Sequence, residues 1–236
     1  MSIVFRPLRV WSLVFCLFLI CAGSSAHAQA TSGNTALNRY LSHIDLGLGA
    51  IGSFTKDVQG INNHKGSTLN QNIDQSASRT LGALITVRYT KSPYFGLEFN
   101  YSYARFTQRY QLINADGSKS WYPGLIGGVQ ANVSEYSFGY VAHPPHEILG
   151  AKPFLAAGAG TTAFRPTPGG GQSLFSRARM TYYYAAGVEK DLNEHFGVRA
   201  QFRQTFYKAP DFGVNYLFVD KQTWTIEPGV GFVIHF

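Results

Sequence analysis

The sequence predicts an all-β protein, a single eight-stranded antiparallel up-and-down transmembrane β-barrel. Three observations support this fold class. Only 14% of the 236 residues are charged, against about a quarter in a typical soluble domain, while 15% are aromatic and Gly occurs 25 times. Eight segments alternate apolar and polar residues with the period of two that strands show. The connections between these segments are alternately short and long, like the turns and loops of outer-membrane barrels.

The first 28 residues are predicted to be a secretory signal peptide. Arg6 and Arg9 precede an uncharged apolar run at 10–22, and small residues follow it. Two sites of the A-x-A type allow cleavage after Ala28 or after Ala30. Both cysteines lie in this segment, so we expect an exported mature chain without disulfide bonds.

The remainder of the chain is predicted to form one domain. Residues 31–42 are mostly polar and are predicted to be a periplasmic lead, and residues 43–236 are predicted to be the barrel. Beyond the signal, no apolar run approaches the roughly 18 residues that a transmembrane helix needs. A membrane protein of the helical class is therefore excluded.

The first three predicted strands are 44–54, 80–89 and 95–104. Each sets an apolar face against a face of small, polar or charged residues, as strands with two different environments do. Their apolar faces are Ile44, Leu46, Leu48 and Phe54; Leu81, Ala83, Ile85, Val87 and Tyr89; and Phe95, Leu97, Phe99, Tyr101 and Tyr103.

The next two predicted strands alternate less clearly, and the last three alternate along their length. In 130–142 only the residues from Tyr136 onward form an apolar face, and the Ala/Gly-rich segment 153–164 leaves its facing open. The last three are 179–189, 196–207 and 224–236. Their apolar faces are Met180, Tyr182, Tyr184, Ala186 and Val188; Phe196, Val198, Ala200, Phe202 and Phe206; and Trp224, Ile226, Pro228, Val230, Phe232, Ile234 and Phe236.

Alternation also occurs in soluble antiparallel sheets, so the polar faces must distinguish a soluble sheet from a membrane barrel. They mix Gly, Ser, Thr and Asn with nearly balanced charges, whereas the clear apolar faces carry no charge. A small, self-neutralising face fits the crowded interior of a narrow barrel. The charged residues on these faces are Asp45, Arg88, Glu98, Glu135, Arg179, Glu189, Arg199, Arg203 and Glu227.

Ion pairs are expected within this interior. A hairpin centred near Asn193 would set residue 189 opposite 197, so that Glu189 reaches Arg199 as a diagonal neighbour. The pattern also pairs Glu227 with Arg203, and Glu98 and Arg88 are expected among the interior ion pairs.

The connection lengths assign the two sides of the membrane. Short turns are periplasmic and long loops extracellular in outer-membrane barrels. The short connections are 90–93, 143–150 and 191–195, and the long ones are 55–78, 108–127, 165–176 and 208–221.

The chain resembles the eight-stranded outer-membrane β-barrel family, the OmpA/OmpX-like group. The C-terminal segment 229–236 is similar to the assembly signal of that family, although Ile234 stands where an aromatic residue is more usual. The resemblance implies a Gram-negative outer-membrane location and a barrel-insertion machinery as partner. Some relatives carry a peptidoglycan-binding domain after the barrel, and none is expected here. The implied signal residues are Gly231, Phe232, Ile234 and Phe236.

A non-enzymatic protein with a structural or surface-interaction role is expected, without metal or cofactor. One alternative is an outer-membrane lipid-modifying enzyme, which would place His with Ser or acids near the outer rim. Only His64 lies in a predicted outer loop, and we interpret it as solvated. A narrow channel for small solutes is the other alternative.

The predicted outer side is basic, because Lys and Arg there outnumber Asp and Glu. No nucleic-acid-binding module is recognisable, so nucleic acid is not an expected partner. Arginine donates in pairs to phosphate oxygens, and lipopolysaccharide phosphates are therefore the expected partner among the outer-membrane lipids. The candidate residues are Arg105, Arg109, Arg165, Arg177 and Arg179.

Overall fold

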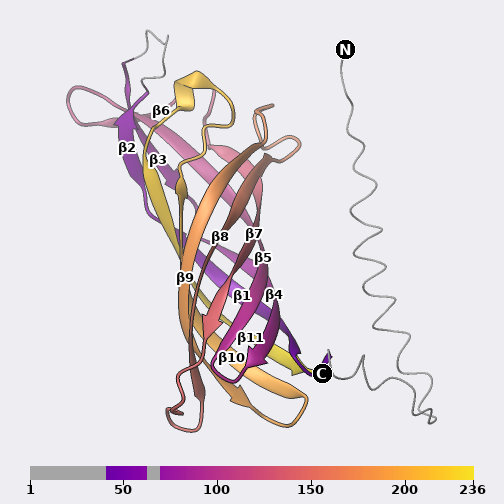
Figure 1. The fold of residues 1–236 in the computed structure, drawn as a ribbon. Coiled ribbons are helices and arrows are strands. Elements are labelled where there is room, and N and C mark those ends of the chain that lie inside the picture. The colour runs from indigo at the N-terminus through magenta and orange to yellow at the C-terminus, as the bar shows by residue number, and fades with distance from the viewer. Residues whose placement is uncertain (1–40, 63–69) are drawn as a thin grey trace. The chain divides into compact units, whose positions relative to one another are not determined.

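The computed structural model describes residues 41–62 and 70–236, and within them the chain forms a closed antiparallel β-barrel (Figure 1). The predicted signal peptide, nearly all of the lead and His64 lie outside the described residues. No helix in the described ranges is long and apolar enough to cross a membrane. The barrel strands are β1 (Ile44–Thr55), β4 (Thr80–Ser92), β5 (Phe95–Ile113), β7 (Val129–Ala142), β8 (Lys152–Pro166), β9 (Arg177–Asp191), β10 (Phe196–Lys208) and β11 (Gln222–His235).

The first and last strands close the ring. Leu48 of β1 lies opposite Ile85 of β4 on one side and opposite Phe232 of β11 on the other. The remaining pairs follow chain order. Strand β5 pairs with β4 and with β7, and each of β7, β8, β9 and β10 pairs with the next barrel strand. The predicted fold class is therefore confirmed: eight antiparallel strands connected up and down.

Most apolar side chains of the barrel strands face outward, and most small, polar or charged ones face inward. Leu81, Phe138 and Phe232 are exposed on the outer wall, whereas Arg88 and Glu98 are buried inside it. The facing of the fifth barrel strand, β8, is also set by the structure. Its inward side chains include Phe154, Ala156, Thr162 and Phe164, and its outward ones include Leu155 and Ala157.

Three short strands lie on the loop side, where only loops were predicted. They are β2 (Val58–Ile61), β3 (Asn72–Ala77) and β6 (Lys119–Trp121). Strand β5 continues to Ile113, well past its predicted end, and pairs there with β3 and β6. The extension has unpaired backbone groups on both edges, beyond the ends of β4 and β7; β3 pairs with one edge and β6 with the other. The loop after β10 also contains a single 3-10 turn, Asn215–Leu217.

Candidate functional site

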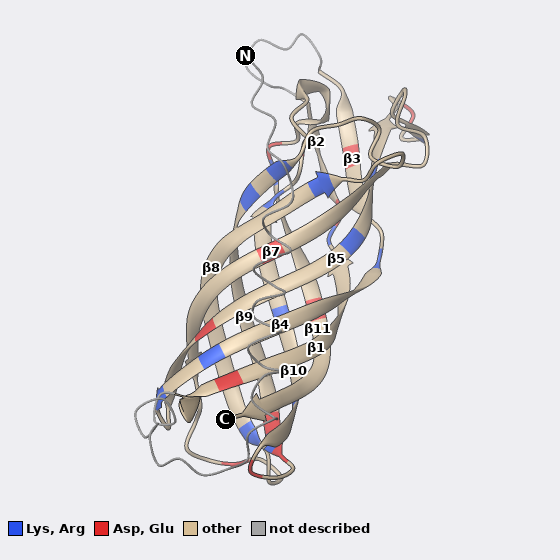
Figure 2. Cartoon of the chain, turned by 90° about the vertical axis from the view of Figure 1, so that its right-hand side faces the viewer, with Lys and Arg blue, Asp and Glu red and all other residues tan. Residues whose placement is uncertain are grey.

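Four charged side chains meet across the lumen towards the turn side of the barrel. Arg88 of β4 donates two hydrogen bonds to Glu189 of β9, at 2.7 and 2.8 Å. Arg199 of β10 lies 3.4 Å from Glu189 and 3.5 Å from Glu98 of β5, and Arg88 lies 3.7 Å from Glu98. All four side chains are buried, and the two bases balance the two acids. Figure 2 shows acidic and basic positions close together on neighbouring strands in this half of the barrel.

The register of the β9–β10 hairpin differs from the prediction. Glu189 lies directly opposite Arg199, and Gly197 lies opposite Asp191. The turn is therefore centred on Glu194 and not near Asn193. The Asn193 side chain explains the shift, because its Oδ1 accepts hydrogen bonds from the backbone N–H groups of His195 and Phe196, at 3.0 and 2.8 Å.

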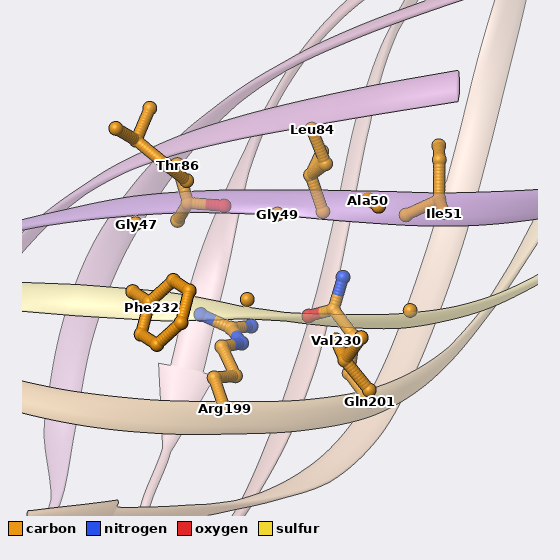
Figure 3. Close-up of a pocket in the computed structure, with 13 residues that line it drawn as sticks. Gly47, Gly49, Ala50, Ile51, Leu84, Thr86, Arg199, Gln201, Val230 and Phe232 are labelled. Carbon is orange, nitrogen blue, oxygen red and sulfur yellow. The ribbon is translucent and has the colours of Figure 1, made fainter. Parts of the chain in front are cut away.

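Glycines on β1 and β11 make room for Arg199. The recess beside it is lined by Gly47, Gly49 and Gly231, and Figure 3 shows Arg199 and Gln201 rising from β10 towards this part of the wall. Gly49 and Gly231 face each other across the closing seam. A Cβ atom at Gly231 would collide with the carbonyl oxygen of Leu48, so only glycine permits this approach of the two backbones.

A second buried cluster lies further towards the loops. Arg203 of β10 is 2.7 Å from Glu227 of β11 and also contacts Glu135 of β7. It donates a further hydrogen bond to Ser137, at 3.0 Å, and its guanidinium carbon lies 4.4 Å from the centre of the Tyr183 ring. Arg203 is 2% exposed. Among the described residues it is the one base paired with these two buried carboxylates.

An apolar plug fills the loop side of the lumen. The loop after β10 turns inward at Pro210, whose carbonyl oxygen accepts hydrogen bonds from Tyr110 (2.8 Å) and Gln75 (3.0 Å). Phe212 is fully buried and packs edge-on against Tyr110, with ring centres 6.4 Å apart. The other buried members of the plug and its surroundings are Ile73, Ala104, Phe106, Leu125, Val129, Ala131, Val133, Phe164, Tyr207, Leu217 and Val219. This core was not predictable from the sequence, because its residues come from loops and strand ends without a common period.

The two charged clusters and the apolar plug predict a barrel without a continuous pore. Eight strands leave an interior just wide enough for side chains, and here ion pairs occupy it at two levels and apolar side chains at a third. We expect purified protein in planar bilayers to give no steady conductance above the bare membrane. Reproducible open channels from the wild-type protein would contradict this expectation.

The five candidate rim arginines fall into two groups. Arg105 of β5 and Arg165 of β8 are exposed and lie opposite the same residue of β7, Asn132, one on each side. Arg109 is exposed on the same outward face of β5 as Arg105.

Arg177 and Arg179 contact Asp211 of the plug loop instead, at 3.2 and 2.8 Å. The sequence could not separate the two groups, because the contact with Asp211 depends on the path of the loop. The strand parity was nevertheless readable, since residues 177 and 179 share the inward face with Glu189.

Asp74 organises the short loop-side strands. It accepts a hydrogen bond from Lys119 of β6, at 2.8 Å, and this contact raises the pKa of Lys119. Partial burial, together with the nearby charge of Asp74, raises the pKa of Asp57. The ion pair between Asp74 and Lys119 therefore links β3 to β6, which lie on either side of the β5 extension.

The described histidines do not form a catalytic or metal constellation at the outer rim. His143 and His235 line the opening on the turn side, where His235 lies 2.7 Å from Asp45 and 3.4 Å from Asp191. Among residues 41–62 and 70–236, no three His, Cys, Asp or Glu side chains are grouped as a metal site requires.

The predicted assembly signal lies on the closing strand. Gly231 faces the lumen, and Phe232 is 64% exposed on the outer wall between Leu48 and Val198. Ile234 pairs with Leu46 and Phe196, and Phe236 follows the end of β11. These residues occupy the strand that must pair with β1 to close the barrel.

Comparison with known proteins places the chain among barrels of this kind. Residues 15–235 match the family described as "Outer membrane protein beta-barrel domain". The structure is similar to that of Neisserial surface protein A, with a TM-score of 0.51 and 13% identity over 82% of this chain and 97% of the other. It is also similar to the outer membrane protein OprG from Pseudomonas aeruginosa, with a TM-score of 0.54 and 14% identity over 82% and 95% of the two chains. No curated protein matches the sequence.

Proposed function

Because the chain belongs to the outer membrane protein β-barrel family and resides in the outer membrane of a Gram-negative bacterium, we propose that it is a non-enzymatic barrel with a structural or surface-interaction role. Its outer rim binds phosphate groups of lipopolysaccharide through arginines on the outward face. The sealed lumen supports a role at the surface over one in solute passage.

The observation that carries this proposal is the position of Arg105 and Arg165. Both side chains face outward in the same rung of the wall, on β5 and β8, with Asn132 of β7 between them. Arg105 donates a hydrogen bond to Gln130, at 2.8 Å, which holds its guanidinium against the wall and leaves further donors free to bind phosphate. Figure 2 shows that Lys and Arg positions predominate towards the loop end.

The residues just below this pair support a lipid ligand. Tyr103 lies one same-face step below Arg105 and donates a hydrogen bond to Asn132, at 3.1 Å. Tyr101 and Tyr136 lie below it, with ring centres 5.1 Å apart. Tyrosines at this level are typical of the interface between the apolar band and the headgroups. A lipopolysaccharide molecule whose phosphate binds Arg105 and Arg165 would thus have its acyl chains along the apolar wall.

The test compares a double substitution of outward-facing arginines with a single substitution of an arginine on the inward face. We expect Arg105→Gln with Arg165→Gln to weaken lipopolysaccharide binding about 30-fold, because each of the two charges near a lipid surface contributes on the order of 1 kcal/mol. The residual binding should depend less on salt, since exposed ionic contacts are screened. Lipid phosphate per barrel, measured across salt concentrations, is the readout.

Arg177→Gln is the matched control, because this arginine contacts Asp211. It should retain wild-type amounts of lipopolysaccharide. Equal retention in the double variant and the control would reject the site at Arg105 and Arg165. A mass shift of lipid A in cells producing the protein would instead favour a lipid-modifying enzyme.

We also propose that the barrel-insertion machinery recognises the chain through Gly231, Phe232, Ile234 and Phe236. Their location on the closing strand supports this role, because the signal is then available until β11 pairs with β1.

A further inference from the structure

An apolar groove runs across the outer wall over β4, β1, β11, β10 and β9. Two depressions of about 690 and 530 Å³ share Ala50, Val188, Ala200 and Val230 and thus form one trough. The floor follows a single rung of the sheet, in which Ala83, Ala50, Val230, Ala200 and Val188 are successive cross-strand neighbours.

Larger side chains border this rung. Leu48 and Phe232 lie two residues along the strands on one side, and Leu81 and Phe202 lie on the other. Same-face neighbours along a strand are about 7 Å apart, so the two borders leave a channel wide enough for a hydrocarbon chain. The outward faces of β5 and β7 differ, because they carry large aromatic residues at the same heights.

The groove is inclined across the membrane. On β4 its floor begins at Ala83, near the loop-side end of the strand at Thr80. On β9 it ends at Val188, near the turn-side end at Asp191. One end of the groove therefore lies at the level of the periplasmic leaflet.

Lys190 marks that periplasmic end. It is exposed, lines the groove and lies opposite Val198 on the outward face. Within residues 41–62 and 70–236 Lys190 makes no ion pair, and the adjacent Asp191 is held by Lys152 at 2.6 Å. The groove thus combines a free cation at the headgroup level with an apolar lining that leads away from it.

We propose that this groove binds one anionic phospholipid of the periplasmic leaflet, with its phosphate at Lys190 and an acyl chain along the rung from Val188 towards Ala83. The charge of Lys190 complements the headgroup, and the apolar floor complements the chain. This site is independent of the lipopolysaccharide site, because it lies at the opposite leaflet and uses different strands.

The experiment counts lipids bound to the barrel by native mass spectrometry after titration with phosphatidylglycerol in detergent. The wild-type protein should retain one phosphatidylglycerol molecule. Lys190→Gln should weaken its binding about fivefold, the effect of one cation near a lipid phosphate. Ala200→Phe should abolish binding by filling the floor of the groove.

Two controls are matched to these variants. Lys91→Gln removes an exposed lysine at the turn-side end of β4, and Ala157→Phe enlarges an exposed alanine on β8, away from the groove. Both should bind as the wild type does, and all variants should keep the mobility difference between unheated and heated samples that a folded barrel shows. Equal binding by Lys190→Gln and Lys91→Gln, or unchanged binding by Ala200→Phe, would overturn the site. A dimer that Ala200→Phe dissociates would identify a second copy as the occupant.

Discussion

Replacing Arg203 with Met is expected to lower the free energy of unfolding by about 3–5 kcal/mol, the cost of leaving buried charge without a partner. Arg203 contacts both Glu135 and Glu227, so its loss leaves two carboxylates facing each other in the lumen. The hydrogen bond to Ser137 is lost as well. Urea unfolding of the barrel in detergent or lipid vesicles, followed by tryptophan fluorescence, measures the difference.

Two further variants test the electrostatic cause of this loss. Gln204→Met, on the neighbouring outward position of β10, should change the free energy of unfolding little, since it removes no buried charge. Adding Glu135→Gln and Glu227→Gln to Arg203→Met should recover much of the loss, because neutral replacement of a complete buried ion cluster is often nearly neutral in stability. If Arg203→Met alone unfolds like the wild type, the cluster does not stabilise the barrel.

Replacing Phe212 with Ala is expected to cost about 3–5 kcal/mol, as truncation of a fully buried Phe does. The ring is the part of the plug loop that packs against Tyr110. The backbone of Phe212 has a φ of 49°, a conformation that residues other than glycine rarely adopt. Packing of the ring must therefore hold the loop in this form. We expect the loop at 209–221 to become sensitive to added protease in the variant.

Phe175→Ala is the matched control for this loss, because Phe175 lies in the neighbouring loop with 68% of its surface exposed. Its truncation should leave both the free energy of unfolding and the protease resistance of 209–221 unchanged. A similar effect of the two substitutions would mean that the plug is not a packed core.

The sequence predicted the strands and their facing well, because strands between lipid and a packed lumen have two different environments. Alternation from Phe95 to Ala104, for example, placed Phe99 outside and Glu98 inside, as the structure has them. The ambiguous segment was β8, in which alanines and glycines occur on both faces, so composition carried no contrast. The neighbours of β8 in the closed sheet, and not its own residues, determine its facing.

Features that depend on the three-dimensional path of the chain were not predictable. The hairpin register shifted with the hydrogen bonds of a single side chain, Asn193. The strands β3 and β6 form because β5 extends beyond both of its neighbours, β4 and β7, and β2 pairs with β3. Arg179 was assigned to the lipid side by its charge, but its position on the inward face leads it to Asp211.

The pairs that cross the lumen also constrain the order of assembly. Arg88 and Glu189 are 101 residues apart in the chain and come from strands on different sides of the ring. Neither can reach the other while the sheet is open, when each has only its partner on the next strand, Glu98 or Arg199, and an incompletely paired charge is costly in hydrocarbon. The inner face must therefore stay hydrated during insertion. Expulsion of that water and formation of the pairs become the final step, which coincides with the meeting of β1 and β11 and makes closure of the barrel hard to reverse.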